Sequence, residues 1–182
     1  MANICSYNAK FITGPSKGYI NSIKKFYKIN KSTRTFLFPL SSERKSIIKD
    51  KDINYIKKYI INKNAPVISF AGSFMRSAYD FKTIKKALEK LEKDKISYNF
   101  ILAGEGELKE ELSDLFSCLE NIIFVGWLDR PKLEVLYSIS SVLIAPYKNT
   151  LNYQGHIPNK VYDAFAKGAA EVYDEVQQHS EL

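Results

Sequence analysis

The chain has 182 residues, 45% of them apolar, and a formal net charge of +7. This length allows one compact domain with an added piece, and no apolar run approaches the roughly 20 residues that a membrane-spanning helix needs. The two cysteines, Cys5 and Cys118, stand far apart and outside any metal-ligand spacing, which is typical of reduced thiols rather than of a disulfide framework. Since no signal-peptide pattern is evident at the N-terminus, we expect a cytoplasmic protein.

The positive charge is concentrated in the first third of the chain. Residues 1–64 hold 14 Lys and Arg against 3 Asp and Glu, a net charge of +11, whereas residues 65–182 carry a net charge of −4. A basic segment of this kind can contact an anionic membrane surface or a nucleic acid, or it can simply form a solvated face. The lysines are not interleaved with aromatic residues as in an RNA-binding motif, so we expect no nucleic-acid partner.

Within residues 1–64, the pattern of apolar residues predicts only scattered elements. The acidic pair Asp50 and Asp52 has the spacing found in metal-dependent sugar transferases, but it lies in a lysine-rich stretch, so we interpret it as surface. Residues 62–66 have the composition of a linker. The expected elements are a helix over 18–28, a short strand over 35–40 and an amphipathic helix over 52–61.

From residue 67 onward, short apolar segments alternate regularly with helical patterns. Nearly continuous apolar strands that alternate with helices are typical of a parallel sheet covered on both faces, so we expect an α/β fold. In such sheets, ligands bind beyond the carboxyl ends of the strands. The expected strands are 67–71, 98–103, 122–125 and 141–145, and the expected helices are 80–91, 108–119, 130–139 and a last one that begins at Pro158.

Glycine follows or ends three of the four expected strands, at Gly72, Gly104 and Gly126. Glycine lets the backbone approach a ligand closely, but the segment Gly104-Glu105-Gly106 also suits a plain turn. The first helix is not opened by G-x-G-x-x-G, and the chain has no P-loop pattern, so neither kind of nucleotide site is predicted. Both histidines are isolated from cysteines and acid clusters, so no metal site is expected.

The segment after the fourth expected strand, residues 157–168, has the pattern of a helix with a charged start. Pro158 suits the first helical position, and Gly168 suits the position just past the end. Lys160 lies beside the unpaired N–H groups of the first turn, where phosphate binds, and the Asp163 carboxylate would accept hydrogen bonds from sugar hydroxyls. The pattern favours a nucleotide diphosphate, but an ordinary capped helix packed on the sheet would share it.

Taken in order, these segments resemble a known family. From about residue 67 to residue 168, the chain resembles the C-terminal, nucleotide-sugar-binding domain of family 4 glycosyltransferases, which have the GT-B fold. The resemblance implies a Rossmann-like parallel sheet with helices on both faces. The matching segments are Phe70-Ala71-Gly72-Ser73, Phe100-Ile101-Leu102-Ala103-Gly104-Glu105-Gly106-Glu107-Leu108, Asn121-Ile122-Ile123-Phe124-Val125-Gly126-Trp127 and Ile157-Pro158-Asn159-Lys160-Val161-Tyr162-Asp163.

The resemblance implies that several of these residues bind a donor sugar nucleotide. Asp163 takes the place of the second glutamate of the family's E-x7-E motif, which accepts hydrogen bonds from the donor's ribose, and Lys160 would face the diphosphate. Gly126 and Trp127 would lie near the base. The other donor-binding candidates follow the first two strands: Gly72, Ser73, Arg76 and Gly104.

The chain also departs from the family pattern at three places. Gly155 stands where the first glutamate of E-x7-E would fall, and Ser73 stands where the family often has arginine. A lysine that the family carries later in the same loop is also missing. Arg76 is the nearby cation that would substitute for them. These departures fit a divergent subgroup.

The resemblance divides the chain into three parts. Residues 1–64 correspond to the end of an N-terminal domain and an interdomain linker, and residues 65–168 correspond to the nucleotide-sugar-binding domain. Residues 169–182 form a divergent acidic tail without Lys or Arg. We expect this tail to continue the preceding helix or to form a loose end, which would leave the strand over 141–145 at an edge of the sheet.

Two functions remain open at this stage. The first is a glycosyltransferase, here truncated, that moves a sugar from a nucleotide diphosphate to a carbohydrate or lipid-linked acceptor, with retention of configuration and without a cofactor or essential metal. The second is a non-catalytic nucleotide-binding or interaction remnant, because the domain that carries the acceptor site in the family is mostly missing. In either case, the basic residues 1–64 would allow contact with an anionic membrane at its inner face.

Overall fold

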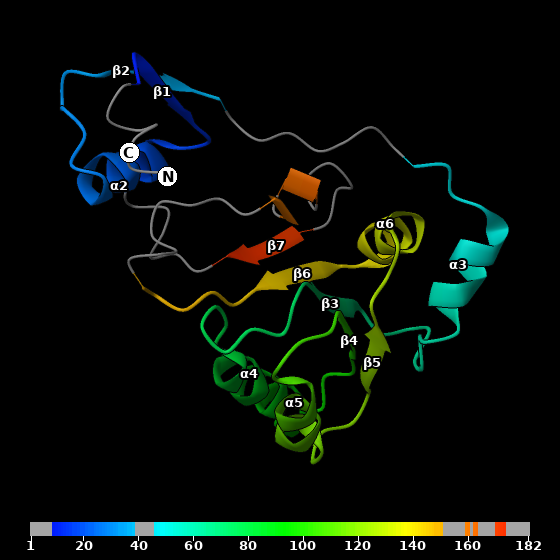
Figure 1. Ribbon diagram of the computed structural model, residues 1–182. Helices are drawn as coiled ribbons and strands as arrows, with labels where there is room; N and C mark the ends of the chain where they lie inside the picture. Colours follow the sequence, from blue (N-terminus) through cyan, green and yellow to red (C-terminus); the bar gives the residue numbers. More distant parts are fainter. Residues whose placement is uncertain (1–8, 39–45, 151–158, 161, 164–169, 174–182) are drawn as a thin grey trace. The chain divides into compact units, whose positions relative to one another are not determined.

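The computed structural model describes residues 9–38, 46–150, 159–160, 162–163 and 170–173 (Figure 1). The chain divides into two compact units. One contains the first helix and the first two strands of the described chain, and the other contains all the later elements. No helix of the described ranges combines the length and the apolar character that crossing a bilayer requires.

The first unit is a small β-α-β arrangement. Strand β1 (Phe11–Gly14) pairs in parallel with β2 (Arg34–Leu37), and helix α2 (Lys17–Phe26) lies between them in sequence. The Ser16 hydroxyl accepts a hydrogen bond from the Tyr19 N–H at 3.1 Å, which caps the start of the helix. The helix and β2 confirm the prediction, whereas β1 was missed because a four-residue strand before Gly14-Pro15 shows too short an alternation.

The second unit is built on one parallel five-stranded sheet. The strand order is β5-β4-β3-β6-β7, and every neighbouring pair is parallel. This confirms the expected α/β fold, because helices join β3, β4, β5 and β6 in turn. The strands are β3 (Val67–Ala71), β4 (Asn99–Ala103), β5 (Ile122–Gly126), β6 (Val142–Ala145) and β7 (Ala170–Tyr173).

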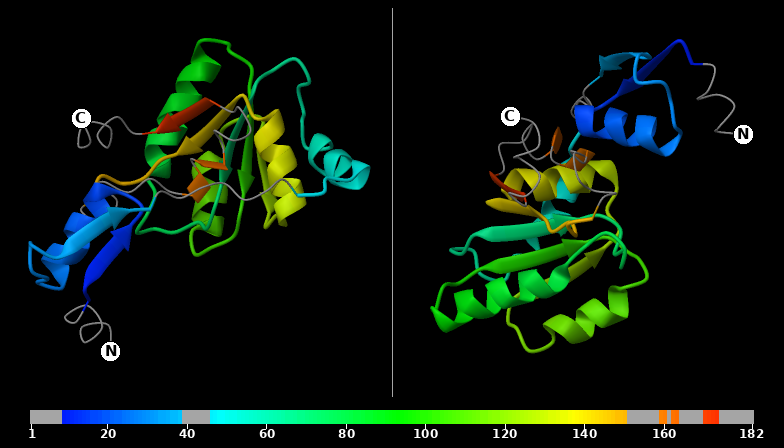
Figure 2. Two further views of the ribbon diagram at one scale, coloured as in Figure 1. Left: turned by 90° about the horizontal axis from the view of Figure 1, so that it is seen from above. Right: turned by 90° about the vertical axis from the view of Figure 1, so that its left-hand side faces the viewer.

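Helices cover both faces of this sheet, as Figures 1 and 2 show. Helices α4 (Phe81–Lys93) and α5 (Lys109–Phe116) lie together on one face, and α6 (Arg130–Ile139) lies on the other with α3 (Asp50–Lys57) against it. The four helices confirm the predicted positions to within a few residues at each end. Pro131 occupies the first turn of α6, and the Asp129 carboxylate accepts from the Lys132 N–H to cap it.

The second unit begins before residue 65, where the sequence placed the start of the domain. Ile56 of α3 is fully buried in the core that α6 forms with the sheet. The buried Asn99 side chain fixes the segment that follows: its Oδ1 accepts from the N–H groups of Ile61 and Asn62, and its Nδ2 donates to the carbonyls of Asn62 and Ala65. The stretch that resembled a linker is therefore anchored to β4.

The interpretation of Asp50 and Asp52 as a surface pair is correct for only one of the two. Asp52 is buried, and its carboxylate accepts from the Lys49 N–H at 3.0 Å to close the first turn of α3. Capping therefore accounts for the Asp52 carboxylate. Within the described ranges, the structure contains no group of three or more His, Cys, Asp or Glu side chains that could hold a metal ion.

The prediction that the strand over 141–145 lies at a sheet edge is wrong. Residues 170–173, which were expected to be helical or loose, form β7 and pair in parallel with β6 from Val142 to Ala145 (Figure 1). Val172 and Tyr173 favour a strand, but the alanines and acids around them masked this signal. Strand β7 therefore takes the edge position and satisfies the backbone of β6.

Candidate functional site

A hollow of about 380 Å³ lies at the carboxyl ends of β3, β4 and β5. Its walls are residues 71–73, residues 103–105 and residues 127–128, with Leu133 and Tyr137 contributed by α6. The structure thus brings together four of the predicted site residues, Gly72, Ser73, Gly104 and Trp127, and Gly126 directly precedes the last of them. Trp127 is 74% exposed, so a flat ligand can reach its ring.

The two glycine-bearing loops at this hollow touch through their backbones. A Cβ on Gly104 would lie 1.9 Å from the carbonyl oxygen of Gly72, and the φ of Gly104 is +144°. Hydrogen bonds hold the loops in place: the Gly72 N–H donates to Ala103 O at 3.0 Å, and the Gly104 N–H donates to Gly126 O at 2.8 Å. A side chain at Gly104 would thus push the loops apart, so this glycine has a steric reason to be there.

Lys160 lies against aromatic rings at the end of β3. Its Nζ is 4.3 Å from the ring centre of Phe70, 4.7 Å from that of Tyr79 and 5.3 Å from that of Tyr147. It also donates to the Tyr79 hydroxyl at 3.2 Å. Attraction between the cation and the ring faces holds the ammonium group at this point. A Cβ on Gly72 would lie 3.1 Å from this Nζ, so the cation stands next to the first glycine-bearing loop.

Asp163 is paired with an arginine of α6. The two guanidinium nitrogens Nη1 and Nη2 of Arg130 each donate to one carboxylate oxygen of Asp163 at 2.9 Å. The Asp163 side chain is 13% exposed and that of Arg130 is 30% exposed. These hydrogen bonds raise the pKa of Arg130 further above its ordinary value, with the nearby negative charges adding to the effect. Arg130 is therefore fully protonated at neutral pH.

Behind this pair lies a buried acid. The side chain of Glu134 is 0% exposed and accepts hydrogen bonds from Arg130 Nε at 3.2 Å, from the Ser46 N–H at 3.1 Å and from the Ser46 hydroxyl at 2.9 Å. Burying a carboxylate is costly unless it is paired and hydrogen-bonded, and here both conditions are met. Three segments of the second unit are thus connected through one arginine.

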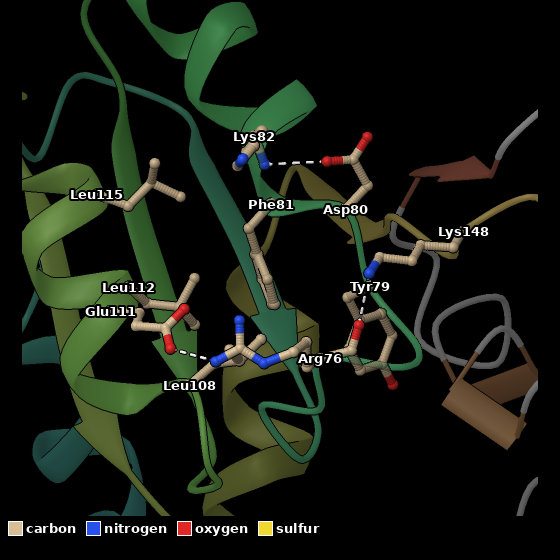
Figure 3. A pocket seen from close by; sticks show the side chains of 10 residues that line it. All are labelled: Arg76, Tyr79, Asp80, Phe81, Lys82, Leu108, Glu111, Leu112, Leu115 and Lys148. Atoms are coloured by element: carbon tan, nitrogen blue, oxygen red, sulfur yellow. Dashed lines mark hydrogen bonds and ion pairs between the residues drawn. The ribbon is translucent and has the colours of Figure 1, made fainter.

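Arg76 does not line the hollow at the carboxyl ends of β3, β4 and β5. It lines a second pocket of about 270 Å³ between the start of α4 and α5, which Phe81, Leu108 and Leu112 also line (Figure 3). Its guanidinium pairs with the Glu111 carboxylate, which raises the pKa of Arg76 through that hydrogen bond. Arg76, which the sequence suggested as a substitute cation for the donor site, is therefore paired with an acidic residue of α5 instead.

Sequence reasoning missed Arg130, Glu134, Tyr79 and Tyr147. Arg130 and Glu134 were noted only as part of a helix, although their i, i+4 spacing predicts an ion pair on that helix. Nothing in the sequence connects Arg130 with Asp163, which lies 33 residues further on. The aromatic residues around Lys160 come from the end of β3 and from two loops, so only the folded chain gathers them. Pro158, Gly155 and Gly168 lie outside the described residues.

Lys160 and Asp163 do not line the hollow itself, but they offer groups that suit an anionic ligand with hydroxyl groups. Lys160 provides a fixed cation beside Gly72, and the Asp163 carboxylate provides acceptors one turn further along the helical segment. Trp127 provides an exposed ring. A cation, an acceptor and a ring suit a phosphate, a sugar and a base, respectively.

The amino-acid sequence matches the family model described as "Glycosyl transferases group 1" over residues 65–182. No match is found among curated proteins.

Several solved structures share the fold of this chain. Sucrose-phosphate synthase from Thermosynechococcus elongatus has a TM-score of 0.70 at 18% identity, covering 93% of this chain and 42% of that one. A glycosyltransferase from Rickettsia africae has a TM-score of 0.70 at 14% identity, covering 89% and 43%. Anabaena Alr3699/HepE in complex with UDP-glucose has a TM-score of 0.69 at 13% identity, covering 93% and 46%. The chain thus spans less than half the length of each of these proteins.

Proposed function

Because the chain belongs to the group 1 glycosyltransferases, we propose that it supplies the nucleotide-sugar-binding part of an enzyme that transfers a sugar to an acceptor. The donor is a nucleoside diphosphate sugar, and the acceptor is a carbohydrate or a lipid-linked sugar. The observation that carries this proposal is the position of Lys160, which is held by three aromatic rings beside Gly72 at the carboxyl end of β3. The UDP-glucose in the structure of Anabaena HepE is consistent with such a donor.

In this proposal each group at the site has one task. Lys160 binds the diphosphate as a point charge, and the Asp163 carboxylate accepts hydrogen bonds from the ribose hydroxyls. The Trp127 ring contacts the base, and the close loops at Gly72 and Gly104 let the backbone approach the donor. Ser73 lies in the same wall of the hollow and can hydrogen-bond to the sugar or the phosphates.

The chemical step breaks the bond between the anomeric carbon and the diphosphate oxygen, and that oxygen keeps the electron pair. The acceptor hydroxyl oxygen forms the new glycosidic bond, and its proton passes to the leaving diphosphate oxygen. Lys160 stabilises the negative charge that develops on the leaving diphosphate, and it needs little reorganisation because the rings already hold it. We propose retention of the anomeric configuration and no metal requirement, since a lysine carries the positive charge.

The test is calorimetric titration of the full 182-residue chain with UDP, GDP and their sugar conjugates, and with the matching nucleoside. Lys160→Gln should weaken binding of the diphosphate about tenfold, as expected for a charged hydrogen bond, while the nucleoside binds as before. Lys90→Gln, which removes an exposed cation from α4, is the matched control. The proposal fails if the wild-type chain binds none of the nucleotides at millimolar concentration, or if both variants weaken binding equally.

A measurement of sugar transfer distinguishes an active enzyme from a module that only binds the donor. Placing the acceptor next to the donor can supply about 7–11 kcal/mol of the barrier, and this chain spans less than half of the solved structures that it matches. We therefore expect the chain alone to bind donor but to transfer little sugar. Rapid transfer by the purified chain to a simple sugar acceptor would contradict this expectation.

We also propose that the basic part of the chain contacts an anionic membrane on its cytoplasmic side. Its support is the net charge of +11 over residues 1–64, since Lys and Arg near an anionic surface each contribute about 1 kcal/mol. Sedimentation with vesicles of phosphatidylcholine, with and without phosphatidylserine, is the test. Binding should require the anionic lipid and should fall in high salt, because surface charges are screened there. Equal binding to both vesicle types would contradict the proposal.

A further inference from the structure

The pairing of Asp163 with Arg130 has a geometry that fixes both side chains. The guanidinium plane offers two parallel donors, and each meets a different carboxylate oxygen at 2.9 Å. Such a fork determines the direction of the carboxylate as well as its position. A lysine at the same place would offer a point charge and leave the carboxylate able to rotate.

Arg130 is itself held from the opposite side. Its Nε donates to Glu134, and Glu134 also accepts two hydrogen bonds from Ser46 in the segment before α3. Because Glu134 has no exposed surface, it cannot exchange these partners for water. The guanidinium therefore has one orientation, set by α6 and by the segment before α3. Its two hydrogen bonds to Asp163 in turn fix the orientation of that carboxylate.

We propose that Arg130 is a positioning residue for donor binding: it aligns the Asp163 carboxylate so that its oxygens meet the ribose hydroxyls of the nucleotide. This inference rests on the proposed function, in which Asp163 contacts the ribose. A carboxylate has about four acceptor sites, so one that is bound by a guanidinium fork can also accept hydrogen bonds from hydroxyl groups. A carboxylate that is already oriented loses less conformational freedom on binding.

The partial exposure of the pair separates this role from a purely structural one. Arg130 is 30% exposed and Asp163 is 13% exposed, so a ligand can still reach the pair although most of it is buried. A structural role predicts that replacing Arg130 changes folding alone. A positioning role predicts a change in how the site distinguishes ligands with and without ribose hydroxyls, even when the protein remains folded.

The experiment compares a ribonucleoside diphosphate with its 2′,3′-dideoxy counterpart on the full chain, using UDP and dideoxy-UDP and repeating with the guanosine pair. The wild-type chain should prefer the ribo form about tenfold, as expected for hydrogen bonds to a charged acceptor. Asp163→Asn should abolish most of this preference. Arg130→Lys should reduce it about threefold to tenfold, although the positive charge is kept. Both ligands are measured on one preparation, so the ratio does not depend on the folded fraction.

Lys132→Gln is the matched control, because Lys132 is another cation of α6 and pairs with Asp129 instead. It should leave the preference unchanged. If Asp163→Asn removes the preference and Arg130→Lys keeps it, the positioning role is wrong while the proposed function stands. If Asp163→Asn also keeps the preference, or if none of the nucleotides binds, Asp163 does not contact the ribose, and both the assignment of Asp163 and this inference fail.

Discussion

The two sides of the candidate site are held by different forces. The loops that follow β3 and β4 are fixed by backbone contact, because Gly104 approaches the Gly72 carbonyl more closely than any side chain would allow. The segment with Lys160 and Asp163 is fixed by side chains: aromatic rings around the ammonium and a guanidinium fork on the carboxylate. One side depends on shape and the other on charge.

This difference predicts how each side responds to change. Backbone packing is insensitive to pH and salt but tolerates no added atoms. Ion pairs and cation–ring contacts tolerate changes in side-chain size but depend on the charge of each partner. A site built in this way has a rigid wall of fixed shape and a second wall that substitutions can adjust in small steps.

The largest effect is expected for Gly104→Ala. The added Cβ would overlap the Gly72 carbonyl at 1.9 Å, and the φ of +144° is strained for any other residue, so we expect a loss of about 4 kcal/mol or more in the free energy of unfolding. Urea denaturation measures it. Gly126→Ala is the control: its φ is +70° and its new Cβ would meet only the flexible Glu105 side chain at 3.2 Å, so about 1–2 kcal/mol is expected. Equal losses would contradict the steric argument.

Glu134→Ala should have the next largest effect. It removes a fully buried carboxylate and leaves Arg130 and Ser46 without their shared acceptor, which should cost about 3 kcal/mol in the free energy of unfolding. Glu134→Gln keeps the shape and one acceptor oxygen, so it should cost less. If alanine and glutamine variants unfold at the same urea concentration, the hydrogen bonds of Glu134 contribute little.

Tyr79→Phe tests the contacts around Lys160. The ring that faces the ammonium remains, but the hydroxyl that accepts from Lys160 at 3.2 Å is lost. We expect a loss of about 1.5 kcal/mol in stability and a modest loss of nucleoside diphosphate affinity. Tyr98→Phe removes the hydroxyl of another buried tyrosine, which donates to Glu92 instead, and should leave nucleotide affinity unchanged. Equal nucleotide affinity in the two variants would contradict a role for the Tyr79 hydroxyl.

The smallest effect concerns the far end of the loop after β3, where a side chain caps α4. The Thr83 hydroxyl and the N–H groups of Lys82 and Thr83 donate to Asp80, and the Thr83 hydroxyl is the largest cause of the lowered pKa of this carboxyl. Asp80→Ala should cost about 1 kcal/mol at pH 7.

Because the pKa of Asp80 is lowered in the folded state, its contribution is present above the ordinary aspartate pKa of about 3.9 and is lost as the pH falls through the lowered value. Unfolding measured from pH 7 to pH 2.5 should show the wild type and Asp80→Ala converging in acid. A difference for Asp80→Ala that stays constant with pH would contradict the role of its charge.

The sequence by itself determined most elements of the second unit. The strands at 67–71 and 122–126 and the helix at 130–139 were predicted almost residue for residue, because buried parallel strands are continuous apolar runs bounded by glycine and the helices carry clear caps. The glycines could also be placed at the ends of strands, because each follows or ends an apolar run. At such a position, glycine lets the backbone come close to a neighbouring loop or a ligand. These are local signals, readable within ten residues.

Only the tertiary structure decided which residues act together. It placed β7 beside β6, because a strand of four residues becomes stable only when a neighbour completes its hydrogen bonds. It paired Arg130 with Asp163, and it paired Arg76 with Glu111 of α5 rather than placing it at the hollow. Such pairings depend on distances between segments that are far apart in the chain. The sequence alone does not show whether a charged side chain faces water or an opposite charge, because folding decides which groups lie near it.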